Sequence, residues 1–114
     1  MRDVKPFMTT CALCATILVT GVSVAAGDEE RTLTIKDHAF SPQEITVKAN
    51  TKIKLVVTNE DTAAEEFESP SLNREKLIRA GQSVTILLPP LKPGRYEFFG
   101  EFHPDTARGA VIAE

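Results

Sequence analysis

The sequence is poor in sulfur and has no excess of positive charge. Its 114 residues include two cysteines and two methionines, and all four lie near the start, at Met1, Met8, Cys11 and Cys14. The chain carries 13 basic and 16 acidic residues, a formal net charge of −3. Proteins that bind nucleic acid present a basic surface to the phosphates. We therefore expect no nucleic-acid partner.

Residues 1–26 have the pattern of an export signal. Arg2 and Lys5 form a short positive start, residues 7–19 are largely apolar, and Val24-Ala25-Ala26 offers small residues for a signal peptidase. We predict that 1–26 is a signal peptide and that 27–114 is a single domain exported to the periplasm. The alternative is a retained membrane anchor, because the apolar run is nearly long enough to span a bilayer.

Cleavage after Ala26 would remove every sulfur atom in the chain. The remaining domain could form no disulfide even in an oxidising compartment. It could not offer thiolate or thioether ligands to a soft metal ion. It would also keep no stable membrane span.

Apolar residues beyond the signal alternate with polar ones, which is typical of half-buried strands. The alternating runs are 32–36, 44–48, 52–58, 82–88 and 95–102, with a shorter run at 109–113. Turn-forming residues separate the runs at short, regular intervals, which indicates an all-β sandwich. We read 72–78 as an extended edge segment with room for one helical turn.

Two stretches of the chain resemble the cupredoxin family. One joins Phe40-Ser41-Pro42, residues 45–49 and Asn59-Glu60-Asp61, and the other is residues 91–104 (LKPGRYEFFGEFHP). The resemblance covers about 32–113 and is closest to the cupredoxin-like domains, EfeO-type among them, that accompany bacterial periplasmic iron uptake. It implies a Greek-key β-sandwich of seven or eight strands.

The resemblance does not extend to the blue-copper ligands. Members with that centre have a histidine, a cysteine, a second histidine and a methionine. In this sequence those positions fall on Glu65, Gly100, His103 and Thr106-Ala107. One ligand of four is kept, so blue colour and fast electron transfer are not expected here.

Two histidines and several carboxylates remain as candidate ligands. The resemblance implies that His38 lies at the same end of the sandwich as His103, and the acidic segment 59–69 closes that end. Imidazole and carboxylate ligands suit Cu(II), and also Zn(II) or iron. We predict His103, His38, Glu65 and Glu101 as metal ligands. If Phe67 is core, the strand alternation turns Glu65 inward, where a carboxylate needs a cation or hydrogen-bond donors.

Structural roles are the alternative for each of these residues. A histidine beside a proline is often a surface residue, His38 could satisfy backbone groups at a strand end, and the glutamates could form a solvated edge. Glu101 starts on the face opposite the core unless the chain turns. We expect Arg74, Lys76 and Arg79 to pair with Glu66 or Glu68.

These observations favour a periplasmic protein that binds copper or a related divalent ion. The resemblance implies an accessory role in iron or copper handling, with a periplasmic iron-binding protein and an iron permease as partners. No residue pattern specifies an enzyme. A ferroxidase would need an electron acceptor that the sequence does not show, and a metal-free docking module that kept the fold is the rival hypothesis.

Overall fold

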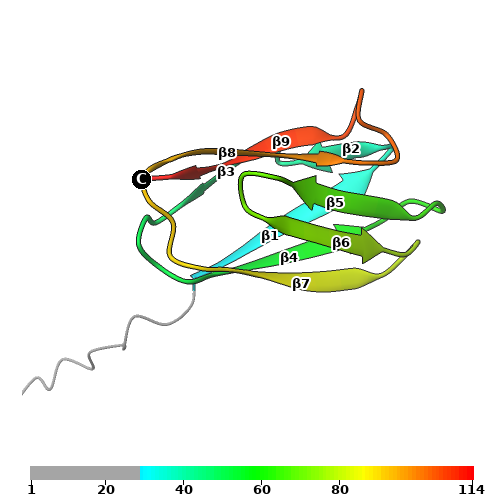
Figure 1. The fold of residues 1–114 in the computed structure, drawn as a ribbon. Helices are drawn as coiled ribbons and strands as arrows, with labels where there is room; N and C mark the ends of the chain where they lie inside the picture. Colours follow the sequence, from blue (N-terminus) through cyan, green and yellow to red (C-terminus); the bar gives the residue numbers. More distant parts are fainter. Residues whose placement is uncertain (1–28) are drawn as a thin grey trace, which may run out of the picture.

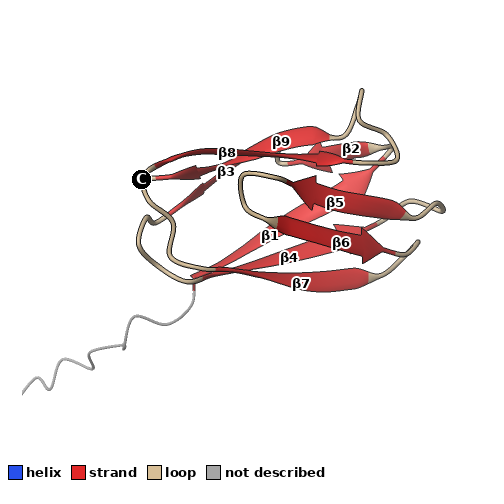
Figure 2. Ribbon diagram, in the orientation of Figure 1, coloured by secondary structure: helices blue, strands red, loops and turns tan. Residues whose placement is uncertain are grey.

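A computed structural model describes residues 29–114, which form a sandwich of two β-sheets (Figures 1 and 2). The predicted signal peptide lies outside the described residues. No helix is present between Glu29 and Glu114, so this part of the chain has none that is long and apolar enough to cross a membrane.

The first sheet has four strands in the order β2-β1-β4-β7. They are β1 (Glu29–Lys36), β2 (Ala39–Ser41), β4 (Ile53–Asn59) and β7 (Ser83–Leu88). β1 runs parallel to β4 and antiparallel to β2. The chain then crosses to the second sheet after β2, where the Ser41–Pro42 peptide bond is cis.

The second sheet has five strands in the order β3-β9-β8-β5-β6. They are β3 (Glu44–Val47), β5 (Glu65–Ser69), β6 (Arg74–Ile78), β8 (Gly94–Gly100) and β9 (Arg108–Ala113). The predicted all-β, two-sheet architecture is confirmed. The described chain has nine strands rather than seven or eight, because β2 is a three-residue strand too short to give an alternating pattern.

Apolar side chains from the inner faces of both sheets form one core. Three phenylalanine rings lie at its centre, Phe40 from β2, Phe67 from β5 and Phe98 from β8, with centroids 5.0–6.2 Å apart. Their edge-on and tilted contacts are those that aromatic quadrupoles favour. Phe67 is fully buried, as the strand alternation predicted.

Three connections meet at one end of the sandwich, on the right in Figure 1. They are the β1–β2 turn, the β4–β5 loop over residues 60–64 and the β8–β9 loop over residues 101–107. The topology therefore brings together three segments that are distant in the sequence. Each of them carries a polar side chain of the candidate site.

Gly109 offers a test of how closely neighbouring strands of the second sheet approach one another. A Cβ at this position would press on the carbonyl oxygen of Gln43 and lie 2.5 Å from Phe98 Cζ. We expect Gly109→Ala to lower the unfolding free energy by about 1–3 kcal/mol, as overpacking does, measured by urea unfolding.

Gly94→Ala is the matched control. The nearest atom to a Cβ there is Tyr96 Cε2 at 3.7 Å, so this change should be neutral or slightly stabilising. Equal stability of the two variants would contradict the packing described.

Candidate metal centre

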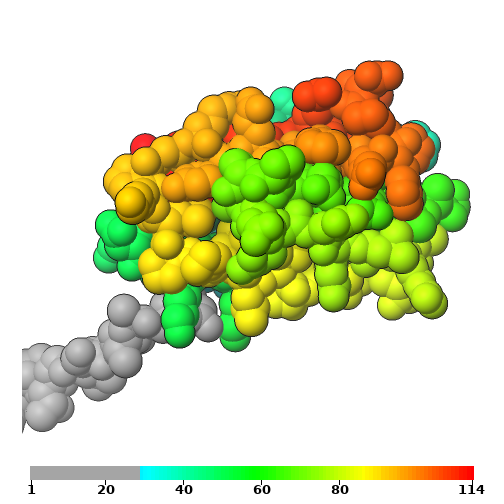
Figure 3. Space-filling view, viewed as in Figure 1, coloured from blue at the N-terminus to red at the C-terminus, as the bar shows by residue number. Residues whose placement is uncertain are grey.

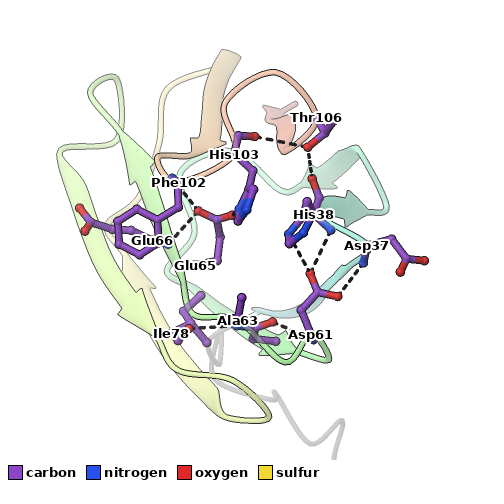
Figure 4. Close-up of polar contacts among 11 residues, drawn as sticks. Asp37, His38, Asp61, Ala63, Glu65, Glu66, Ile78, Phe102, His103 and Thr106 are labelled. Atoms are coloured by element: carbon purple, nitrogen blue, oxygen red, sulfur yellow. Dashed lines mark hydrogen bonds and ion pairs between the residues drawn. The ribbon is translucent and has the colours of Figure 1, made fainter.

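Glu65 is a buried carboxylate at the start of β5. It is 1% exposed and follows the same inward alternation as Phe67, as predicted. Its Oε1 accepts hydrogen bonds from the backbone N–H groups of Glu66 (3.0 Å) and Phe102 (2.9 Å), and its Oε2 lies 2.6 Å from His103 Nδ1 (Figure 4). The protein itself thus supplies three N–H donors to the buried charge.

Gly100 makes room for that carboxylate. A Cβ on Gly100 would lie 2.6 Å from Glu65 Cδ and 2.7 Å from Ala107 Cβ. The space next to Gly100 is therefore filled by the carboxyl group of Glu65. The absence of a side chain at position 100 and the inward glutamate depend on each other.

His103 reaches Glu65 because the chain turns after β8. The N–H of His103 donates to the carbonyl of Gly100 (3.1 Å), and the carbonyl of His103 accepts from Ala107 (2.9 Å). This turn brings the imidazole back over the end of the sandwich, with its side chain 30% exposed. The chain does turn between Glu101 and His103, as a site there requires.

His38 is presented by a tight turn between β1 and β2. Asp37 and His38 form this two-residue connection, and both have positive φ, 52° and 57°. That is the pattern of a type I′ hairpin turn. The carboxylate of Asp61 accepts both of its N–H groups, from Asp37 at 2.7 Å and from His38 at 2.9 Å.

The two imidazoles stack face to face. Their centroids are 3.6 Å apart and their planes are 16° from parallel. His38 Nδ1 lies 3.6 Å from Asp61 Oδ2, so each ring has a carboxylate on the side of its Nδ1. The hydroxyl of Thr106 donates to the His38 carbonyl and links the turn to the β8–β9 loop. Within residues 29–114, neither Nε2 has a hydrogen-bond partner.

Of the four predicted ligands, the structure brings three together: His38, His103 and Glu65. It places Glu101 in a different group, whose carboxylate oxygens all lie within 4.8 Å of one another. The members are Glu66, Glu68, Glu75 and Glu101. They lie on the outer side of the second sheet: three belong to β5 and β6, whose surface is green in Figure 3, and Glu101 follows β8.

Like charges dominate this carboxylate group. The neighbouring carboxyl of Glu75, and then that of Glu101, can accept a hydrogen bond from protonated Glu66, and together with desolvation they raise the pKa of Glu66 to about 8. No ion pair within residues 29–114 joins a lysine or arginine to the group. The expected pairing of Arg74 with Glu66 or Glu68 is wrong, because its Nε donates to the Leu87 carbonyl instead.

Sequence reasoning missed the roles of Asp61 and Thr106. Asp61 was only one of several acidic loop residues, and Thr106 stood where a methionine was sought. A local signal for Asp61 was present: its N–H donates to the Asn59 side chain, a short-range turn typical of Asn-x-Asp. The contact of Thr106 with His38 has no local signal, since 68 residues separate them.

Comparison with known sequences gives the family. The chain matches the cupredoxin-like domain family over residues 9–113. It belongs to this family. It is also 52% identical over 80 residues to an uncharacterized protein of Rickettsia prowazekii (strain Madrid E), a match that covers 70% of this chain and 64% of that protein.

Solved structures with this cupredoxin-like fold include several copper proteins. Auracyanin A, a blue copper protein of Chloroflexus aurantiacus, has a TM-score of 0.66 at 12% identity, covering 77% of this chain and all of that one. Amicyanin from Paracoccus versutus gives 0.60 at 19%, covering 77% and 84%. The metal-binding domain of a Cu(I)-exporting P-type ATPase of Streptococcus pneumoniae gives 0.64 at 13%, covering 75% and 84%. At these identities the likeness shows the fold.

The residues of this cupredoxin-like domain do not fit a copper–thiolate centre. The position that the resemblance assigns to the cysteine is Gly100, and the Glu65 carboxyl occupies the adjoining space. The methionine position holds Thr106, whose hydroxyl is bonded to the His38 carbonyl. The two imidazoles and two carboxylates at this end are instead the nitrogen and oxygen donor types that a divalent ion such as Cu(II) or Zn(II) takes.

Asp61 should stabilise the fold through the turn that carries His38. The N–H of His38 lowers the pKa of Asp61 below its usual range. Its stabilisation is therefore present above about pH 3.9, the ordinary Asp value, and is lost as pH falls through the lower folded value. We expect Asp61→Ala to lower the unfolding free energy at neutral pH by about 1.5–3 kcal/mol, measured by urea unfolding.

The matched control for this change is Asp105→Ala, at an exposed aspartate in the β8–β9 loop. It should change stability little. An Asp61→Ala protein as stable as the Asp105→Ala protein would contradict the role given to the turn.

Glu66 should make the domain less stable as pH rises. Its raised pKa means that the folded chain holds a proton between about pH 4.5 and about pH 8 that the unfolded chain releases. Wild-type stability should fall across this interval, and Glu66→Gln should flatten the fall. Urea unfolding at several pH values measures both, with Glu60→Gln as the control. An unchanged pH profile in Glu66→Gln would contradict the crowding described.

Proposed function

We propose that this cupredoxin-like protein binds a divalent metal ion, Cu(II) foremost and zinc or iron as alternatives, through the imidazoles of His38 and His103. The observation that carries the proposal is the stacked histidine pair, in which each ring has a carboxylate beside its Nδ1. Metal-binding histidines commonly have one ring nitrogen held by a carboxylate while the other binds the ion.

The two rings cannot hold one ion in their present orientation. A metal binds an imidazole nitrogen along the lone pair, which lies in the ring plane. With the planes nearly parallel and the centroids 3.6 Å apart, an ion in the plane of one ring lies well outside the other. Metal binding therefore requires the stack to open. His38 is the freer ring, with its side chain 47% exposed against 30% for His103.

The proposed cellular role is accessory to iron or copper handling in the periplasm. It rests on the resemblance to the cupredoxin-like domains of iron-uptake systems and on the predicted export signal. The partners proposed are a periplasmic iron-binding protein and an iron permease. Ferroxidase assistance would further require an electron acceptor supplied by one of them.

Titration with Cu(II) tests the function. We expect His38→Ala and His103→Ala each to weaken binding at least tenfold, about 1.4 kcal/mol, in calorimetric titration.

Binding should also weaken as pH falls, because protons compete for the imidazole nitrogens. The copper-loaded protein should lack the strong thiolate–Cu(II) charge-transfer absorption at about 600 nm, since residues 27–114 contain no cysteine.

The rival hypothesis is a metal-free docking module that kept the cupredoxin-like fold. It agrees with the fact that the buried Glu65 carboxylate already has three N–H donors and needs no cation. Under that hypothesis the wild type and both histidine variants bind copper equally and weakly. That result would overturn the metal-binding proposal.

A further inference from the structure

The two oxygens of the Glu65 carboxylate have different partners. Oε1 takes both backbone donors, the N–H groups of Glu66 and Phe102, and Oε2 faces only His103 Nδ1 (Figure 4). Glu65 is 1% exposed, and its carboxyl group fills the space beside Gly100. Glu65 can neither withdraw from His103 nor turn toward solvent without losing these contacts.

This arrangement determines which ring nitrogen of His103 carries the hydrogen. An ionised carboxylate only accepts hydrogen bonds, so Nδ1 must be the donor in the 2.6 Å contact. The neutral ring then has its lone pair on Nε2. That nitrogen has no hydrogen-bond partner within residues 29–114, and the side chain is partly exposed.

We infer that Glu65 is a positioning residue for metal binding, not a ligand: it fixes the His103 ring so that Nε2 is the metal-binding nitrogen. This inference rests on the proposed function. A cation at Oε2 would have to displace the Nδ1 hydrogen and break the 2.6 Å contact between Glu65 and His103. A cation at Nε2 leaves every hydrogen bond of Glu65 in place.

The same geometry predicts an unusual effect of Glu65→Gln. The glutamine side chain is close in shape, but only one of its two terminal atoms accepts hydrogen bonds. The two backbone donors should draw the amide oxygen to the Oε1 position, which turns the amide NH₂ toward His103 Nδ1. Nδ1 must then accept, so the hydrogen moves to Nε2 and blocks the metal-binding nitrogen.

Long-range ¹H–¹⁵N NMR of the histidine rings tests this inference. The wild-type chain, metal-free and at neutral pH, should show His103 with its hydrogen on Nδ1, assigned by comparison with His103→Gln. Zinc, which is diamagnetic, should then shift the Nε2 resonance and leave Nδ1 protonated. Glu65→Gln should show the reversed tautomer and at least tenfold weaker zinc binding. Glu60→Gln, the same charge change in the neighbouring loop, should do neither.

Each outcome is decisive. A hydrogen on Nε2 in the wild type, or zinc bound through Nδ1, would overturn the inference. An unaltered tautomer in a folded Glu65→Gln protein would also overturn it, and the wild-type spectra decide the question if that variant does not fold. The predicted wild-type tautomer in a protein that binds neither zinc nor Cu(II) would instead show that the proposed function is wrong.

Discussion

The buried charge of Glu65 is the constraint on which this end of the sandwich depends. An isolated carboxylate inside a protein costs several kcal/mol, so it persists only where donors surround it. Two backbone N–H groups and one imidazole meet that need. The absence of a side chain at Gly100, the turn after β8 and the position of His103 all follow from placing this carboxylate inside.

A second carboxylate supports the other half of the site. Asp61 binds the two N–H groups of the β1–β2 turn and lies beside His38, much as Glu65 binds backbone donors and His103. Each histidine is thus joined to the fold through an acidic residue from one end of the β4–β5 loop. On the outer face, by contrast, Glu66 Oε1 is buried with no hydrogen-bond partner among the described residues, and three further carboxylates surround it. The carboxylates next to the histidines therefore have hydrogen-bond donors, whereas those on the outer side of the second sheet mainly have one another as neighbours.

Much of the fold could be predicted from the alternation of apolar and polar residues alone. Period-two patterns predicted most strands, and the inward turn of Glu65 followed from a single assumption about Phe67. The contacts that complete the site depend on loops whose paths no local pattern determines. The partner of Asp61 is a turn 24 residues away, and the stacking of His38 on His103 needs two hairpins to meet. Glu101 was predicted as a ligand because it is close to His103 in the sequence. Its carboxylate lies instead with the other glutamates on the outer side of the second sheet.

The fold belongs to a family known for copper sites, yet in this chain a carboxylate hydrogen-bonded to an imidazole lies beside the cysteine position. The most direct test of this pair is a double-mutant cycle of unfolding free energies with Glu65→Ala, His103→Ala and the double variant, because alanine at either position forms no new side-chain hydrogen bond. A Glu65–His103 hydrogen bond to a buried charge predicts a coupling energy of about 1 kcal/mol or more. Strictly additive effects of the two changes would contradict it.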